Sequence, residues 1–141
     1  AGLYACARGS RKWRAASDEK NFTKRPIRAL AMYDSMLYVA TETPSSLLSY
    51  HIGQNTWQEY TLPEIGNSRR VSIAASNKHV WISTNQGAFL LNLTDRLWTR
   101  YHTTEGLIHG GVQAILAGQN HIWFGTAEGL SRFHWSRALL E

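Results

Sequence analysis

The hydrophobic and polar positions of this chain form short runs rather than long stripes. Short stretches rich in β-branched and aromatic residues alternate with polar turns at 76–78, 85–87 and 118–120. Runs of this kind, bounded by turn residues, are typical of β-strands, and no window sustains the apolar period of an amphipathic helix. The pattern therefore predicts an all-β protein built from many short strands.

The same pattern recurs along the chain. One six-residue segment occurs three times, at 36–41, 79–84 and 121–126. Each copy has an aromatic residue at its third position and ends in threonine. The terminal threonines are Thr41, Thr84 and Thr126, which places the copies about 42 residues apart. Four strands in a repeat of ~40–45 residues is the arithmetic of a β-propeller blade.

Other markers keep the same spacing. A small apolar strand lies upstream of each copy and carries Leu30, Ile73 and Ile115 in turn. A downstream segment occurs at 47–50, 88–91 and 130–133, and residues 2–6 form an earlier copy of it. Trp13, Trp57 and Trp98 follow three of these segments at equal distance. We expect these tryptophans to mark outer strands that cover blade edges.

The repeats predict blades of four antiparallel strands, about three in number. The predicted units are a truncated N-terminal blade with a basic loop (1–26), two blades (27–69 and 70–111) and a C-terminal blade that lacks its outer strand (112–141). Closed propellers have ~4–8 blades, so an arc of about three leaves two sheet faces bare. We therefore expect either a segment of a longer propeller or a half that completes a ring by self-association.

Composition narrows the class of protein. Hydrophobic residues make up 43% and aromatic residues 11% of the 141 positions, which is too apolar for a disordered tail. No apolar run approaches the ~20 residues of a membrane span, so membrane insertion by this segment is not expected. The single cysteine, Cys6, allows no internal disulfide. Because the chain neither starts with Met nor shows a leader, we expect a mature product, an excised piece or an interior stretch.

The net charge of +5 is local. Between positions 8 and 28 there are eight basic residues against two acidic ones, and the rest of the chain holds seven against eight. A solvated basic loop explains this distribution better than a nucleic-acid surface, which spreads Lys and Arg along a whole face. Nucleic acid is therefore not an expected partner.

The last repeat resembles a known family. It reads Gly-Leu at 106–107, Val-x-x-Ile at 112–115, Ile-Trp-Phe-Gly-Thr at 122–126 and Gly-Leu-x-Arg-Phe at 129–133. This is similar to the two-component regulator propeller repeat, and the resemblance covers most of 27–135. The middle repeat matches in part and the first in outline. An acidic residue that often follows the third strand in that family is replaced here by His51, Asn92 and His134.

The resemblance implies seven-bladed propellers in periplasmic sensor regions of hybrid histidine kinases. Such regions are thought to bind glycans or to mediate dimer signalling. The resemblance thus favours a non-enzymatic sensor, ligand-binding or protein-interaction segment of a signalling receptor, in a periplasmic or extracytoplasmic location. A glycan or another small anionic ligand and self-association are the expected partners, and no cofactor or metal is expected.

The candidate ligand-binding residues are Arg28, Arg69, Arg70 and His109. Arg70 takes the place that Ile27 and Val112 hold in the other repeats. A long cation on an innermost strand, with two other arginines nearby, predicts a site for a carboxylate or sulfate at the channel mouth. The alternative is a register slip that leaves Arg70 in a solvated loop.

The histidines suggest chemistry more weakly. His79 and His121 are repeat equivalents at turns on different blades, so we expect them to be turn residues. His102, Glu105 and His109 share one loop, which is a poor frame for a metal or a general base.

No catalytic motif is present, and we expect no catalytic residue. One alternative is a lyase, since residues 121–124 are similar to a strand of the streptogramin-lyase propellers. A second alternative is a lectin-like propeller assembled from identical chains.

Overall fold

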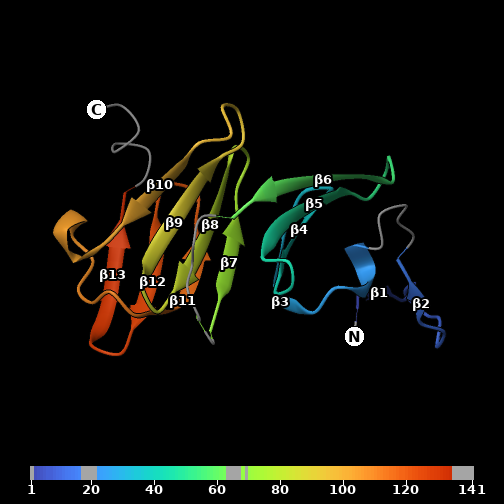
Figure 1. Ribbon diagram of the computed structural model, residues 1–141, viewed down its shortest axis with the longest axis horizontal. Coiled ribbons are helices and arrows are strands. Elements are labelled where there is room, and N and C mark those ends of the chain that lie inside the picture. Colours follow the sequence, from blue (N-terminus) through green and yellow to red (C-terminus); the bar gives the residue numbers. More distant parts are fainter. Residues whose placement is uncertain (1, 17–21, 63–67, 69, 135–141) are drawn as a thin grey trace.

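The computed structural model describes residues 2–16, 22–62, 68 and 70–134. Within these ranges the chain is a succession of short β-strands with two single-turn 3₁₀ helices, Phe22–Lys24 and Thr103–Glu105, as Figure 1 shows. The predicted all-β class is therefore confirmed. In the part of the chain just defined, no helix has the length and apolar character needed to cross a membrane.

The strands form four antiparallel sheets whose strand order follows the sequence. The N-terminal sheet pairs β1 (Tyr4–Ala5) with β2 (Arg14–Ala15). The first complete sheet consists of β3 (Ile27–Tyr33), β4 (Met36–Thr41), β5 (Ser46–His51) and β6 (Thr56–Thr61). The second consists of β7 (Ser72–Ala75), β8 (His79–Thr84), β9 (Gly87–Asn92) and β10 (Trp98–Tyr101). The third consists of β11 (Val112–Ala117), β12 (Ile122–Thr126) and β13 (Gly129–Phe133).

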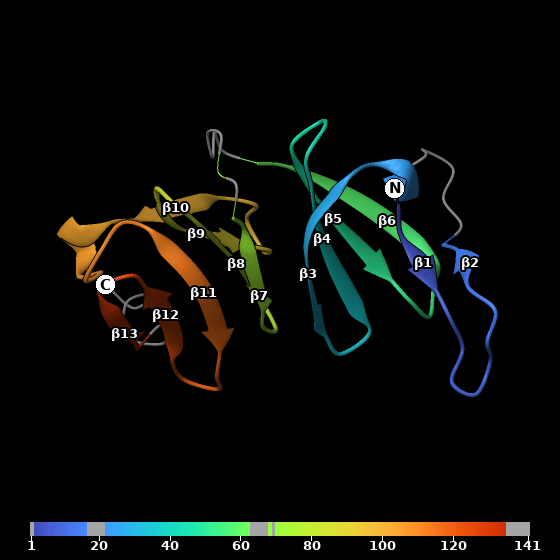
Figure 2. The same ribbon diagram turned by 90° about the horizontal axis from the view of Figure 1, so that it is seen from below.

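The sheets stand next to one another as successive blades of an arc (Figures 1 and 2). The innermost strand of each sheet meets its neighbour: β3 lies against β7, and β11 lies against β7 and β8. Figure 2 shows that the arc does not close on itself. The molecule is thus a partial propeller, as the blade count predicts.

The sheet register aligns the repeats residue by residue. Tyr38, Trp81 and Trp123 occupy the same place in β4, β8 and β12, opposite an apolar residue of the innermost strand in each sheet. Their partners are Ala31, Ala74 and Leu116. A three-dimensional equivalence between blades therefore follows directly from the repeat spacing of the sequence.

Two hydrophobic clusters join the three blades. Strand β8 is buried along its whole length because its two faces meet different neighbours. Val80 and Ile82 pack toward the first sheet with Tyr38, whereas Trp81 packs toward the third sheet with Phe124. A strand sandwiched in this way is apolar at successive positions, which explains the continuous apolar runs of 80–82 and 88–91.

The outer strands carry the spaced tryptophans. Trp57 lies in β6, where its ring stacks on Tyr50 at 4.5 Å between centroids. Trp98 lies in β10, and its Nε1 donates a 3.0 Å hydrogen bond to the backbone oxygen of Thr61 in the preceding sheet. Trp13 instead precedes β2 and is 69% exposed. Two of the three tryptophans therefore anchor blade edges, and the third does not.

Two of the positions where the similar repeats often carry an acidic residue still support turns. His51 Nδ1 accepts a hydrogen bond from the Gln54 backbone N–H at 3.2 Å, and Asn92 Oδ1 accepts one from the Thr94 N–H at 2.9 Å. A ring nitrogen and an amide oxygen thus supply the acceptor that a carboxylate would offer. The replacement preserves the turn after the third strand in these two blades.

Candidate functional site

Arg28, one of the four candidate ligand-binding residues, lies near the start of the innermost strand of the first blade. Arg28 lies at a β-bulge between Ile27 and Ala29, and its Nη2 is 3.5 Å from Oε1 of Glu42. Its Nη1 is buried and makes no hydrogen bond within the described residues. One edge of the guanidinium is therefore paired, and the other keeps an unused donor.

Arg70 lies outside the sheet. The first pair between β7 and β8 is Ser72 with Ser83, which corresponds to Ala29 with Ala40 in the first blade. The ladder of the second blade thus begins after the place of Ile27 and Val112, and Arg70 is an exposed residue ahead of β7. Arg69 lies outside the described residues. The role of both arginines in ligand binding stays a prediction.

His109 is engaged locally. Its Nδ1 accepts a 3.0 Å hydrogen bond from the backbone N–H of Gly111, just before β11. In the described structure, no hydrogen bond or ion pair joins His109 to Arg28 or to Arg70. The structure therefore places three of the four candidates ahead of, or at the start of, the three inner strands without forming a contact among them.

The other histidine cluster of the sequence forms a helix cap. The His102 backbone N–H donates a 2.6 Å hydrogen bond to Oε2 of Glu105. Hydrogen bonds from the Thr104 side chain and from His102 lower the pKa of the exposed Glu105 carboxyl. Across the described ranges, no group of three or more His, Cys, Asp or Glu residues is arranged to hold a metal ion.

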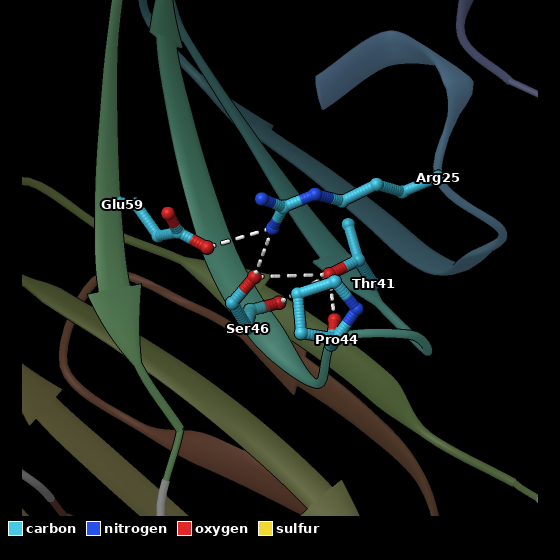
Figure 3. A network of polar contacts seen from close by, with 5 residues as sticks. All are labelled: Arg25, Thr41, Pro44, Ser46 and Glu59. Atoms are coloured by element: carbon cyan, nitrogen blue, oxygen red, sulfur yellow. Dashed lines mark hydrogen bonds and ion pairs between the residues drawn. The ribbon is translucent and has the colours of Figure 1, made fainter. Parts of the chain in front are cut away.

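A polar network ties the N-terminal basic stretch to the first sheet (Figure 3). Arg25 Nη1 lies 2.7 Å from Oε1 of Glu59 and 2.8 Å from Oγ of Ser46, which is hydrogen-bonded to Thr41 Oγ1 at 3.0 Å. The Thr41 hydroxyl also lies 2.7 Å from the backbone oxygen of Pro44, which it can reach as a donor. Sequence reasoning missed this pairing, because no local spacing links two residues 34 positions apart.

A pocket lies at the opposite end of the innermost strands. Its volume is about 490 Å³, within the ~300–1,000 Å³ usual for small-molecule sites. The last residues of the innermost strands of three successive blades form its wall, together with turn residues of the second and third blades. The lining residues are Tyr33, Ala75, Ser76, Asn77, Ala117, Gly118 and Gln119. Each of the three blades therefore contributes the same end of its innermost strand to one shared hollow.

The chemistry of this pocket differs from that of the arginine end. Among its lining residues, Tyr33 offers an aromatic ring that is 41% exposed, and Asn77 and Gln119 offer amide donors and acceptors. The described residues that line it include no lysine, arginine or carboxylate. The arrangement suits an uncharged ligand with one flat apolar side and hydrogen-bonding edges. The turns at 76–78 and 118–120 were evident in the sequence, but nothing local indicated that they meet Tyr33 of the first blade.

Comparison with known proteins adds evidence on the fold. No protein-family model matches the chain, and no curated protein matches it either. Two solved structures of the extracellular domain of BT4673 from B. thetaiotaomicron, described once as a one-component and once as a hybrid two-component system, are similar to it. Both are 22% identical, with TM-scores of 0.60 and 0.61, and the similarity covers 86% and 88% of this chain.

A third similar structure is YCF48 bound to D1 peptide, at 14% identity, a TM-score of 0.56 and 89% coverage of this chain. This chain spans only 16% and 17% of the two BT4673 chains and 42% of the YCF48 chain. At these identities the similarity shows the fold alone. The first two neighbours are extracellular domains of a signalling system, which fits the resemblance of the repeat to the two-component regulator propellers.

Proposed function

We propose that this chain is part of a non-enzymatic, extracytoplasmic sensor propeller of a two-component-type signalling receptor, and that it binds ligand at an end of the propeller axis. The observation that carries the ligand site is the pocket that three successive blades build at one end of their innermost strands. The repeat resemblance and the extracellular signalling neighbours support the sensor role.

The residues at the two ends of the inner strands suit different ligands. The pocket of Tyr33, Asn77 and Gln119 suits a neutral glycan ring, which stacks on an aromatic side chain and hydrogen-bonds to amides. The end with Arg28 and Arg70 suits a carboxylated or sulfated glycan. We favour the neutral ligand, because Tyr33, Asn77 and Gln119 line one shared pocket, whereas Arg28 and Arg70 make no contact with each other in the described structure.

Isothermal titration with neutral and with uronic-acid or sulfated oligosaccharides tests this choice. Tyr33→Ala is expected to weaken binding of a neutral oligosaccharide by about two- to twelvefold, since aromatic stacking contributes on the order of 0.5–1.5 kcal/mol. Arg28→Ala combined with Arg70→Ala serves as the matched control and is expected to leave that binding unchanged.

If binding is lost in the double arginine variant and unchanged in Tyr33→Ala, the ligand site lies at the end of the strands that holds Arg28 and Arg70. Absence of binding to every probe, in a folded chain and in a longer propeller that contains it, would overturn the ligand-binding proposal.

A further inference from the structure

The face of the first sheet that looks away from the second sheet is only half covered. Leu30, Val39 and Leu48 lie side by side across β3, β4 and β5 on that face. Val39 and Leu48 are 2% and 1% exposed, because Phe22 and Leu3 pack on them. Leu30 is 51% exposed, and Met32 on the same strand is 59% exposed. On this face the part over β4 and β5 is therefore covered, whereas the part over the innermost strand β3 is open.

The other blades show what occupies this place. The equivalents of Leu30 and Met32 in the third blade are Ile115 and Ala117, which pair with β12 as those two pair with β4. Both pack into the second hydrophobic cluster, because β11 lies against β7 and β8 of the preceding blade. In the third blade, these positions are thus covered by the inner two strands of the preceding blade.

The N-terminal sheet supplies only an outer pair. Gly2 stands just ahead of β1, as Gly87 and Gly129 stand at the start of β9 and β13, and all three have positive φ angles of 144°, 122° and 137°. Strand β1 therefore corresponds to β9, whose second edge pairs with β8. In the described residues β1 pairs with β2 alone, so the edge that corresponds to the β8 side is unpaired.

We propose that the free edge of β1 and the open apolar face at Leu30 and Met32 bind a two-stranded β-hairpin of the chain's own inner type, equivalent to β7–β8. The register follows from the second blade, where Thr84 pairs with Gly87 and Ile82 with Phe89. The partner's equivalent of Thr84 lies opposite Gly2, and its equivalent of Trp81 faces the first sheet. Backbone pairing and apolar burial both favour this occupant.

A fusion protein tests the proposal, with residues 70–86 copied directly ahead of Gly2 in place of Ala1. The chain has two methionines, and the copied segment adds none. Met32 reports on the open face, whereas Met36 packs on the first hydrophobic cluster and serves as the internal control. Because peroxide oxidation follows exposure, sulfoxide formation at Met32 is expected to slow roughly tenfold in the fusion, with Met36 unchanged.

The matched control is the same fusion with Trp81→Lys in the copied segment only, which places a charge on the face toward the first sheet. It is expected to leave Met32 as reactive as in the parent chain. Equal protection by both fusions, or no protection in a monomeric fusion with intact β-sheet circular dichroism, would overturn the proposal.

Two further measurements keep the proposal testable if the fusion misfolds. A synthetic peptide of residues 70–86, added to the parent chain, is expected to protect Met32, and the Trp81→Lys peptide is not. Light scattering on the parent chain addresses a second copy as the occupant. A dimer whose dissociation on dilution exposes Met32 would replace the hairpin with another copy of this chain.

Discussion

The second and third blades follow the same repeat, yet equivalent residues are buried in the second blade and exposed to solvent in the third. Trp81 is 1% exposed and Ala88 is 0% exposed in the second blade. Their equivalents are Trp123, which is half-buried, and Leu130, which is 64% exposed. The difference does not come from the residue types. It comes from the third sheet covering the second, while no further sheet of the described residues packs on the outward face of the third.

The third blade adapts to its bare face with a charged side chain. Leu90, opposite Trp81, is 2% exposed, whereas the residue opposite Trp123 is Arg132. The guanidinium carbon of Arg132 lies 5.6 Å from the Trp123 ring centroid. A long cation covers an aromatic face with its stem while its head stays in water. The blade is therefore compatible with solvent on this side.

The largest effect should come from the paired tryptophans. Trp81→Ala removes a ring packed between two sheets and is expected to lower the free energy of unfolding by about 3–5 kcal/mol. Trp123→Ala loses mainly a contact with Arg132 and is expected to cost about 1 kcal/mol. Urea unfolding of the two variants measures the difference. Equal costs would mean that another surface covers Trp123 in solution.

Gly87 and Gly129 begin the third strands of the second and third blades, β9 and β13, and allow a second comparison. Both have positive φ, so alanine at Gly129 is expected to cost about 1–3 kcal/mol through backbone strain alone. A Cβ at Gly87 would also lie 2.5 Å from the Tyr101 backbone oxygen, whereas at Gly129 its nearest neighbour is a flexible isoleucine methyl at 3.5 Å. Thermal unfolding should therefore show a larger loss for Gly87→Ala. The opposite order would contradict the packing of β9 on β10.

Two equivalent threonines make the same hydrogen bonds but differ in solvent exposure, since Thr84 is buried and Thr126 is half-buried. Thr84 Oγ1 bonds the Gly87 oxygen at 3.2 Å and accepts from the Gln86 N–H at 3.0 Å, and Thr126 repeats this with Gly129 and Glu128. Thr84→Val leaves buried polar groups unpaired and is expected to cost about 1–3 kcal/mol. Thr126→Val is expected to lower the free energy of unfolding by well under about 1 kcal/mol, because water can hydrogen-bond to the groups that lose the hydroxyl. Chemical denaturation of both valine variants checks the order.

The smallest expected effect depends on pH. Burial lowers the pKa of His79, and Lys78 lowers it further while Asp95 acts in the opposite direction. The folded state therefore favours the neutral ring, so this stability is complete above the unfolded pKa of about 6.5 and is lost as pH falls below it. His79→Gln should flatten the decline in stability between about pH 7 and 5.

Its repeat equivalent provides the control for that measurement. The pKa of His121 is also lowered, by desolvation first and then by His134 and Arg132, but this ring lies at the edge of the bare blade. His121→Gln is expected to change the pH profile little. A larger change at His121 than at His79 would contradict the difference in burial between the two blades.

Sequence reasoning predicted the architecture because repetition is visible in one dimension. The spacing of the aromatic third position located Tyr38, Trp81 and Trp123, and these residues are true equivalents in the sheets. It succeeded less well for the site. The pocket depends on Tyr33, Asn77 and Gln119 meeting across blades, and no local pattern encodes that meeting.

The sequence by itself determined the strand pattern, the repeat and the partial-propeller class, since each is a consequence of local alternation and spacing. Only the tertiary structure decided which copies of a residue are buried, where Arg25 finds its carboxylate, and that Arg70 lies ahead of its strand. These outcomes depend on what packs against a blade from a neighbouring one. Such contacts join residues far apart in the chain, so their energies leave no signature in the order of residues near either partner.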